Sequence, residues 1–243
     1  MSVSELSASA QNYLKAVWGL QEWTDEPVTP TALAAKVGVR MSSVSDAVRR
    51  LSEQGLLTHT PYGAVELTEE GRRYAVAMVR RHRLIETFLV DVLGYTWDQV
   101  HDEAETLEHA VSDFMIDRID ERLGQPSRDP HGDPIPSAEG VLDAPDACLL
   151  SSVSPGARVR VERISDADPE LLRFFADKDF RIGIELEVRE GAPFSGAVEV
   201  LCPDGAALAL GQAATDAVWV TIEPAPLRRV STSKVDSDST RRG

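Results

Sequence analysis

The chain has 243 residues, of which 42% are hydrophobic and 27% charged, and its formal net charge is −15. This length suits two or three globular domains, and no run approaches the roughly 18 apolar residues that a membrane helix needs. Because the N-terminus lacks a basic region followed by an apolar one, and Cys148 and Cys202 have no metal-type spacing, we expect a cytoplasmic protein with reduced thiols that does not contact a membrane.

The net charge is unevenly distributed along the chain. Residues 1–83 hold ten Lys or Arg and nine Asp or Glu, so the excess acid lies in the C-terminal two thirds. A near-neutral N-terminal part can still bind DNA through local basic residues.

After an apolar-periodic helix around residues 13–20, the segment 29–55 predicts two helices joined by a tight turn. Thr29 and Pro30 suit the start of the first helix and Gly38 its end. Ser42 is the expected cap of the second. An inward apolar stripe is expected at Val44, Val48 and Leu51. This spacing is typical of a helix-turn-helix.

Alternating residues on either side of Pro61-Tyr62-Gly63 predict a hairpin, or wing, and Thr68 is the expected cap of the next helix. The polar side of the second helix would then face a DNA groove. The candidate DNA-contacting residues are Lys36, Arg40, Ser42, Ser43, Asp46, Arg49 and Arg50. The alternative interpretation is a helical hairpin whose exterior is merely polar.

Two segments that follow carry metal-ligand residue types. Residues 78–94 read as a long helix with a broad apolar face, on which His82 and Glu86 lie four positions apart. In "HDEAETLEH", residues 101–109, a helix brings His101, Glu105, Glu108 and His109 within an arc of roughly 100°. No Lys or Arg occurs in residues 101–117, so these groups would repel one another unless a cation binds. The alternatives are an ordinary surface pair and a solvated acidic helix.

Four prolines in residues 124–140 mark the end of the helical part. His131 lies among them and is expected to be exposed and without function. From residue 156 onward, alternation over 157–164, 184–190, 197–202 and 217–222, with a short helix near Asp168-Pro169, predicts a small five-stranded barrel. Residues 224–243 are expected to be disordered.

A winged helix-turn-helix followed by "HRLIETFLVDVLG", "HDEAETLEH" and "RDPHGDPIP" resembles the diphtheria toxin repressor family of metal-dependent transcription factors, over about residues 10–223. The resemblance implies a mainly α fold with a small SH3-like β-barrel. The implied divisions are a DNA-binding domain (1–75), a helical dimerisation and metal-binding domain (76–125), a linker (126–152), the SH3-like domain (153–223) and a tail (224–243).

The resemblance also implies two metal sites per subunit. The first falls on Asn12, Glu105, Glu108 and His109. The second falls on His82, Glu86 and His101, and Asp168 is the best candidate for a further ligand, with a helix N-cap as its alternative role. Iron-responsive members of the family carry Met and Cys where this chain has Asn12 and Glu105. The oxygen-rich set resembles the manganese-responsive branch and suits hard Mn²⁺, although that branch usually has Asp at the position of Asn12. Lys15, one turn later, cannot be a ligand.

By resemblance we expect a homodimeric, Mn²⁺-activated repressor of metal-uptake genes that binds a pseudo-palindromic operator. We do not expect an enzyme. The apolar faces of residues 84–93 and 104–119 would form the dimer interface. The alternatives are an Fe²⁺-responsive regulator of the same family, a carboxylate-bridged metalloenzyme and a metal-independent adaptor. The chain holds no Glu-x-x-His pair of the di-iron type, which weighs against the enzyme.

Overall fold

The computed structural model describes residues 3–24, 26–59 and 63–223. The tail predicted for residues 224–243 lies outside this part, as do Pro61 and Tyr62 of the predicted wing tip. Within the described residues, no helix combines the length and the hydropathy that crossing a membrane requires.

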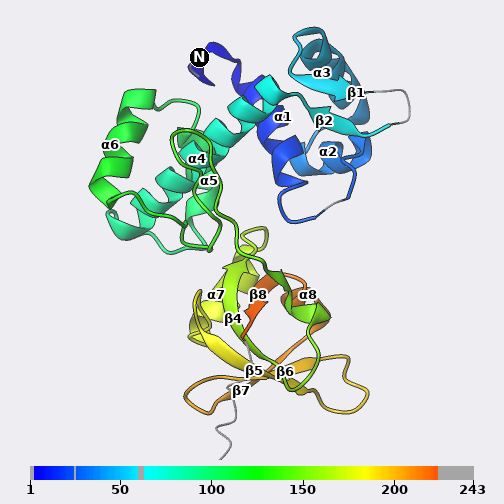
Figure 1. Cartoon of the computed structure of the whole chain (residues 1–243), viewed down its shortest axis with the longest axis vertical. Coiled ribbons are helices and arrows are strands. Elements are labelled where there is room, and N and C mark those ends of the chain that lie inside the picture. The colour runs from blue at the N-terminus through cyan, green and yellow to red at the C-terminus, as the bar shows by residue number, and fades with distance from the viewer. Residues whose placement is uncertain (1–2, 25, 60–62, 224–243) are drawn as a thin grey trace, which may run out of the picture.

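The N-terminal part is a helix-turn-helix with a two-stranded hairpin (Figure 1). As predicted, the Thr29 hydroxyl accepts a hydrogen bond from the backbone N–H of Ala32, and Gly38 ends the helix with a φ of 72°. The predicted apolar stripe is buried in the core. The elements are η1 (Val3–Glu5), α1 (Ala8–Gly19), α2 (Pro30–Val37), α3 (Met41–Glu53), β1 (Leu57–His59) and β2 (Val65–Leu67).

The predicted cap at Ser42 is wrong. The N-cap of helix α3 lies two residues earlier, at Arg40, and makes no side-chain hydrogen bond, so the helix begins at Met41. The Ser42 side chain is therefore left on the exposed surface at the start of the helix.

Helix α4 (Glu69–Asp91) is continuous across residue 75 and connects the helix-turn-helix part to the helical part. Thr68 caps it, as predicted, by accepting from the backbone N–H of Gly71. Three helices pack against α4: α1, α5 (Val100–Leu107) and α6 (Asp113–Leu123). A second core forms there, from Leu84, Ile85, Leu89, Val100, Ala104, Ile116, Ile119 and Ile135.

The C-terminal part is a six-stranded antiparallel sheet in the order β3-β8-β4-β5-β6-β7, with its own core. The four alternating stretches are strands, as predicted, but the count of five is wrong because two short strands, β3 and β7, join the sheet. Helix α7 (Pro169–Asp177) follows β4, and 3-10 helix η2 (Leu150–Ser152) and α8 (Gln212–Thr215) are short. The strands are β3 (Cys148–Leu149), β4 (Arg158–Ile164), β5 (Glu185–Glu190), β6 (Val198–Leu201), β7 (Ala207–Leu210) and β8 (Val218–Ile222).

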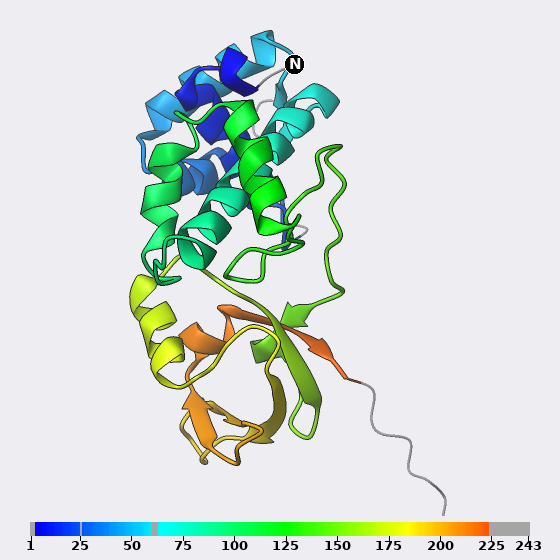
Figure 2. The same ribbon diagram turned by 90° about the vertical axis from the view of Figure 1, so that its left-hand side faces the viewer.

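The β domain lies against one end of the two helical parts, as both ribbon views show (Figures 1 and 2). Arg163 of β4 holds this junction together. Its guanidinium lies over the rings of Trp23 and Trp219, 5.1 and 4.2 Å from their centroids, and its Nε is 2.7 Å from Asp133 Oδ1. Cation–π contacts and an ion pair thus connect the β domain to the loop that follows α1 and to the linker.

Candidate metal centre

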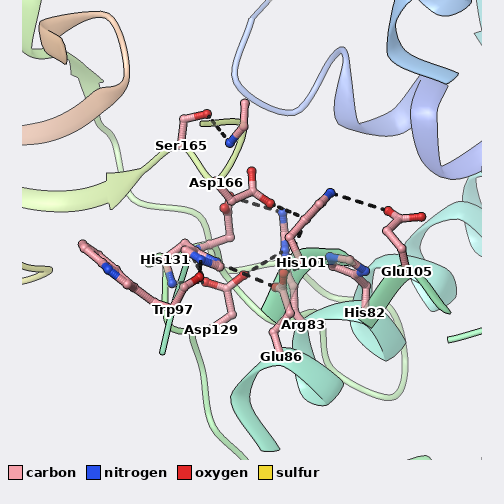
Figure 3. Close-up of polar contacts among 12 residues, drawn as sticks. His82, Arg83, Glu86, Trp97, His101, Glu105, Asp129, His131, Ser165 and Asp166 are labelled. Atoms are coloured by element: carbon pink, nitrogen blue, oxygen red, sulfur yellow. Dashed lines mark hydrogen bonds and ion pairs between the residues drawn. The ribbon is translucent and has the colours of Figure 1, made fainter. Parts of the chain in front are cut away.

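A polar cavity of about 280 Å³ lies where α1, α4, α5, the linker and the β4–α7 loop meet. Because α4 presents His82 and Glu86 one turn apart on one face, both side chains point into this space. Helix α5 adds His101 and Glu105 with the same spacing (Figure 3). Segments far apart in the sequence therefore place their titratable side chains around one cavity.

The first group of possible ligands comprises His82, Glu86, His101 and Asp166. Glu86 Oε1 lies 3.1 Å from His82 Nε2 and 3.6 Å from His101 Nδ1, while His101 Nδ1 lies 2.8 Å from Asp166 Oδ2. The sequence predicted the first three members of this group as the second site. Asp166 was missed.

The protonation of this group is strongly perturbed. Burial disfavours the charged form of His82, but Glu86 and Glu108 outweigh it and raise the pKa of His82 to about 9. Asp166 and Glu86 raise the pKa of His101 to about 10. Against the effect of burial, the facing imidazoles lower the pKa of Glu86 and of Asp166. The carboxylates are therefore ionised, and a metal would compete with protons for the imidazoles.

A second group comprises His82, Glu105 and Glu108. Glu108 is fully buried at the C-cap of α5, and its Oε2 lies 2.5 Å from His82 Nδ1. The Lys15 ammonium of α1 donates to Glu105 Oε1 and to Glu108 Oε1, both at 2.5 Å. The sequence did not predict that Lys15 would pair with the carboxylates of these two candidate ligands.

Replacing Lys15 with Met should tighten Mn²⁺ binding at the Glu105–Glu108 group by about tenfold, since a competing positive charge is removed. The metal-stripped protein should become less stable, because buried Glu108 loses a counterion. Calorimetric titration and thermal unfolding in chelator would measure both effects. Lys178→Met, at an exposed position, is the matched control. Weaker Mn²⁺ binding by the Lys15 variant would contradict the prediction.

Asn12 and His109, the other members of the predicted first site, lie beside this group. Asn12 lines the cavity, and its buried Oδ1 has no hydrogen-bond partner among the described residues. His109 Nε2 lies 3.7 Å from Glu108 Oε1. An unpartnered amide oxygen and an imidazole nitrogen directed at a carboxylate are suitable donors for a hard cation.

Gln11 fixes the orientation of His109, a role that the sequence did not indicate. The Gln11 amide nitrogen donates to the backbone carbonyls of Val3 and Leu6, so its Oε1 must accept from His109 Nδ1, 2.7 Å away. This leaves the lone pair on Nε2, the nitrogen that faces Glu108. Such a second hydrogen bond is the usual way in which proteins orient a ligand histidine.

Asp168 does not reach the cavity group. It is the N-cap of α7 and accepts from the backbone N–H groups of Glu170 and Leu171. The alternative role given for Asp168, a helix N-cap, is therefore confirmed. Among the described residues of the C-terminal domain it is Asp166 whose side chain joins the group, against His101. The ligand role of Asp168 was implied only by the family resemblance, whereas the proline that follows it favours the helix start that the structure shows.

The expectation that His131 is exposed is also wrong. Its side chain is only 1% exposed, and with Glu86 and Asp129 it forms a third group of possible ligands. The linker residues that surround it fold back against α4 and β4: the backbone N–H of Ile164 donates to the carbonyl of His131. A proline-rich composition predicted an irregular segment but could not reveal this packing.

The predicted DNA-contacting side chains are spread over α2, its following turn and the outer face of α3. All seven are exposed: Lys36, Arg40, Ser42, Ser43, Asp46, Arg49 and Arg50. Arg49 forms an exposed pair with Glu53 at 3.1 Å. The opposite face of α3 is the buried apolar stripe, so this helix has one polar side and one apolar side.

Part of the apolar surface predicted to form the dimer interface is buried within the protomer. Leu84, Ile85 and Leu89 are buried against α5 and α6 in the second core. Other apolar side chains of the same helical part are exposed on the surface. These are Val92, Leu93, Tyr95, Phe114 and Met115, with Phe114 68% exposed.

Comparison with known proteins agrees with this arrangement. Three family profiles match in series: the iron dependent repressor N-terminal DNA binding domain over residues 5–65, its metal binding and dimerisation domain over 68–137, and the FeoA domain over 148–222. The diphtheria toxin repressor of Corynebacterium efficiens is 32% identical over 200 residues, which cover 76% of this chain and 85% of that protein. The iron-dependent repressor IdeR of Mycobacterium tuberculosis is 39% identical over 138 residues, 55% of this chain and 58% of that protein.

Solved structures provide a further similarity. A manganese-dependent transcriptional repressor in complex with manganese is 50% identical, with a TM-score of 0.84, over 88% of this chain and 100% of that chain. At this identity the similarity extends beyond the fold to many of the side chains.

Proposed function

Because the chain belongs to the diphtheria toxin repressor family of metal-dependent transcriptional repressors, we propose that it is the Mn²⁺-activated member that controls metal-uptake genes as a homodimer. The observation that carries the proposal is the position of Glu108. Its buried carboxylate contacts Lys15 of α1 and His82 of α4, and both helices belong to the body that supports the DNA-reading helix.

The residues present fit two Mn²⁺ ions per subunit. Asn12, Glu105, Glu108 and His109 would hold the first, and His82, Glu86, His101 and Asp166 the second. These donors are carboxylate, amide and imidazole, and both cysteines lie in the C-terminal part, outside these groups. Hard oxygen donors suit Mn²⁺, although Zn²⁺, Ni²⁺ and Cu²⁺ would bind such sites more tightly, so geometry and metal supply must determine the choice.

The bound ion would supply positive charge between the carboxylates of α5 and the donors of α1. Helix α1 packs on both α4 and α3, so fixing Asn12 against Glu105 and Glu108 restricts the position of the DNA-reading head. In a homodimer this sets the separation of the two heads, and two-fold symmetry requires a pseudo-palindromic operator. A coupling of about 1–3 kcal/mol suffices, and operator DNA must tighten Mn²⁺ binding by the same factor.

The proposed function is tested by stripping the protein with chelator and selecting genomic DNA fragments at fixed salt. Parallel selections contain no metal, micromolar Mn²⁺ or anaerobic Fe²⁺. Retention with Mn²⁺ alone supports the proposal and yields the operator. Retention without metal, or with Fe²⁺ alone, contradicts Mn²⁺ activation, and retention under no condition contradicts the repressor function itself.

Replacing Arg49 with Ala should weaken binding to all DNA sequences alike and flatten the salt dependence by about one unit of log–log slope, as expected for a phosphate contact. Fluorescence anisotropy with operator and unrelated DNA, over a series of salt concentrations, would measure this. Arg118→Ala is the matched control, because Arg118 forms a similar exposed pair with Glu121 on α6. A loss confined to the operator would instead identify Arg49 as a base-reading residue.

A further inference from the structure

The segment that connects α1 to α2 contacts the β domain through a tryptophan. Trp23 lies on this segment, and its ring centroid is 5.8 Å from that of Trp219 on β8. The guanidinium of Arg163 on β4 lies over both rings, as described above. Because α2 begins at Pro30, this contact joins the β domain to the part of the chain that leads directly into the helix-turn-helix.

A single carboxylate oxygen connects three parts of the chain at this contact. Asp133 Oδ1, in the linker, accepts a hydrogen bond from the indole N–H of Trp23 at 3.0 Å and one from Arg163 Nε at 2.7 Å. The Arg83 guanidinium of α4 lies 3.2 Å from the same oxygen. The side chains of Asp133 and Arg163 are only 6% and 12% exposed, so salt screens their attraction weakly. Trp23 is therefore held by a directional hydrogen bond as well as by its ring contacts.

The linker and the end of β4 form one closely packed unit. Gly132 has a φ of 90°, and a Cβ at this position would overlap the carbonyl oxygen of Glu162, so glycine is needed for the two backbones to approach this closely. The backbone N–H of Ile164 donates to the carbonyl of His131, and Arg128 pairs with Glu162 at 2.9 Å. A displacement of the end of β4 would therefore displace the linker residues beside it.

The loop after β4 carries Asp166, three residues beyond Arg163. Its Oδ2 lies 2.8 Å from His101 Nδ1, in the group proposed for the second ion. One short segment thus contacts a proposed metal site through Asp166 and the approach to the helix-turn-helix through Arg163. An ion that fixes Asp166 would restrict the end of β4, and Arg163 would impose this restriction on Trp23.

We propose that Arg163 is a positioning residue, which couples the second Mn²⁺ site to the DNA-reading head through the β domain. The inference rests on the proposed function. It adds a route that is separate from the one through Asn12 and α1. Glu22, beside Trp23, is tied to α4 by hydrogen bonds from Arg83 at 2.8 and 2.6 Å. Loss of Arg163 should therefore release the segment from the β domain without unfolding it.

The variant Arg163→Met tests this route, because Met keeps an apolar contact with the two rings but has neither the charge nor the N–H donors. Arg163→Lys is the conservative variant, since an ammonium can still bind the ring faces and pair with the linker carboxylate. Trp23→Leu interrupts the same contact from the other side. Arg160→Met is the matched control: Arg160 lies on the same strand but pairs with Glu185 and Glu223, both in the C-terminal part.

The first measurement is operator affinity of the full-length dimer at saturating Mn²⁺, by fluorescence anisotropy. Arg163→Met and Trp23→Leu should each weaken binding by about tenfold. Arg163→Lys should weaken it by less than about threefold, and Arg160→Met should not change it. In the background of Asp166→Ala, which removes the ligand from the β domain, Arg163→Met should cause no further loss, because both changes interrupt one route. Unchanged affinity in Arg163→Met, or a full tenfold loss in the Asp166→Ala background, would overturn the proposal.

Hydrogen–deuterium exchange of the same proteins without DNA measures the coupling independently of the operator. Mn²⁺ should slow exchange in peptides covering residues 18–24 of the wild type and of Arg160→Met by at least about threefold. In Arg163→Met it should slow exchange in α5 but not in residues 18–24. Equal slowing of residues 18–24 in Arg163→Met would overturn the proposal and leave the proposed function intact. Wild-type protein that binds no DNA in a Mn²⁺-dependent manner would instead refute the proposed function.

Discussion

Replacing Glu108 with Gln should abolish Mn²⁺-activated DNA binding, with Mn²⁺ affinity at the first site falling by more than about 100-fold. Both oxygens of this fully buried carboxylate have a partner, Lys15 on one side and His82 on the other. Gln preserves the shape, but it removes the charge and replaces one oxygen with an amide donor. The fold should persist, because the α5 backbone is held separately: Arg81 donates to the Glu108 carbonyl at 3.0 Å.

The matched control is Glu103→Gln, a loss of the same charge from the exposed side of the same helix. It should retain the full Mn²⁺ response. His109→Ala should behave like Glu108→Gln, since it removes the imidazole that Gln11 directs at Glu108. Anisotropy with operator DNA across a Mn²⁺ titration, together with circular dichroism and gel filtration, separates lost metal response from lost structure. An unimpaired response in both variants would contradict the assignment of the first site.

The sequence predicted those candidate ligands that helical periodicity brings together. His82 with Glu86, and His101 with Glu105, are separated by one turn, so spacing alone places each pair on one face. The absence of Lys and Arg from residues 101–117 supported the interpretation that these groups hold a cation. In the structure, however, Lys15 of α1 places a positive charge beside Glu105 and Glu108. Local patterns cannot reveal such a partner, because Lys15 and Glu108 are joined only by the packing of α1 near α5.

The residues that sequence reasoning missed all depend on tertiary packing. Asp166 approaches His101 only because β4 and α7 dock against the helical part. The family resemblance pointed instead to Asp168, which caps α7. His131 is buried because the linker folds back against β4, whereas composition indicated only an irregular segment. The short strands β3 and β7 were missed for local reasons. Strand β3 has two residues, too few to show alternation, and β7 has the sequence ALAL, in which no polar residue alternates with the apolar ones.

The affinity of the second site for Mn²⁺ should rise by about 100-fold for each pH unit between pH 6 and 8. The pKa of His82 is raised to about 9 and that of His101 to about 10, so both imidazoles are protonated throughout this range in the metal-stripped protein. Mn²⁺ binds only the neutral rings, and each ion therefore displaces two protons. The carboxylates contribute no further protons, because the pKa values of Glu86 and Asp166 are lowered.

Calorimetric titration at pH 6, 7 and 8, in buffers of different ionisation enthalpy, would count these protons directly. His101→Gln should reduce the count to one. The stability of the metal-stripped protein depends on pH in the opposite direction. Imidazoles with a raised pKa stabilise the fold fully below their unfolded pKa of about 6.5. This contribution is lost as the pH rises through 9 to 10. Alkaline pH should thus weaken the stripped protein while strengthening Mn²⁺ binding. Affinity independent of pH would show that these imidazoles do not hold the ion.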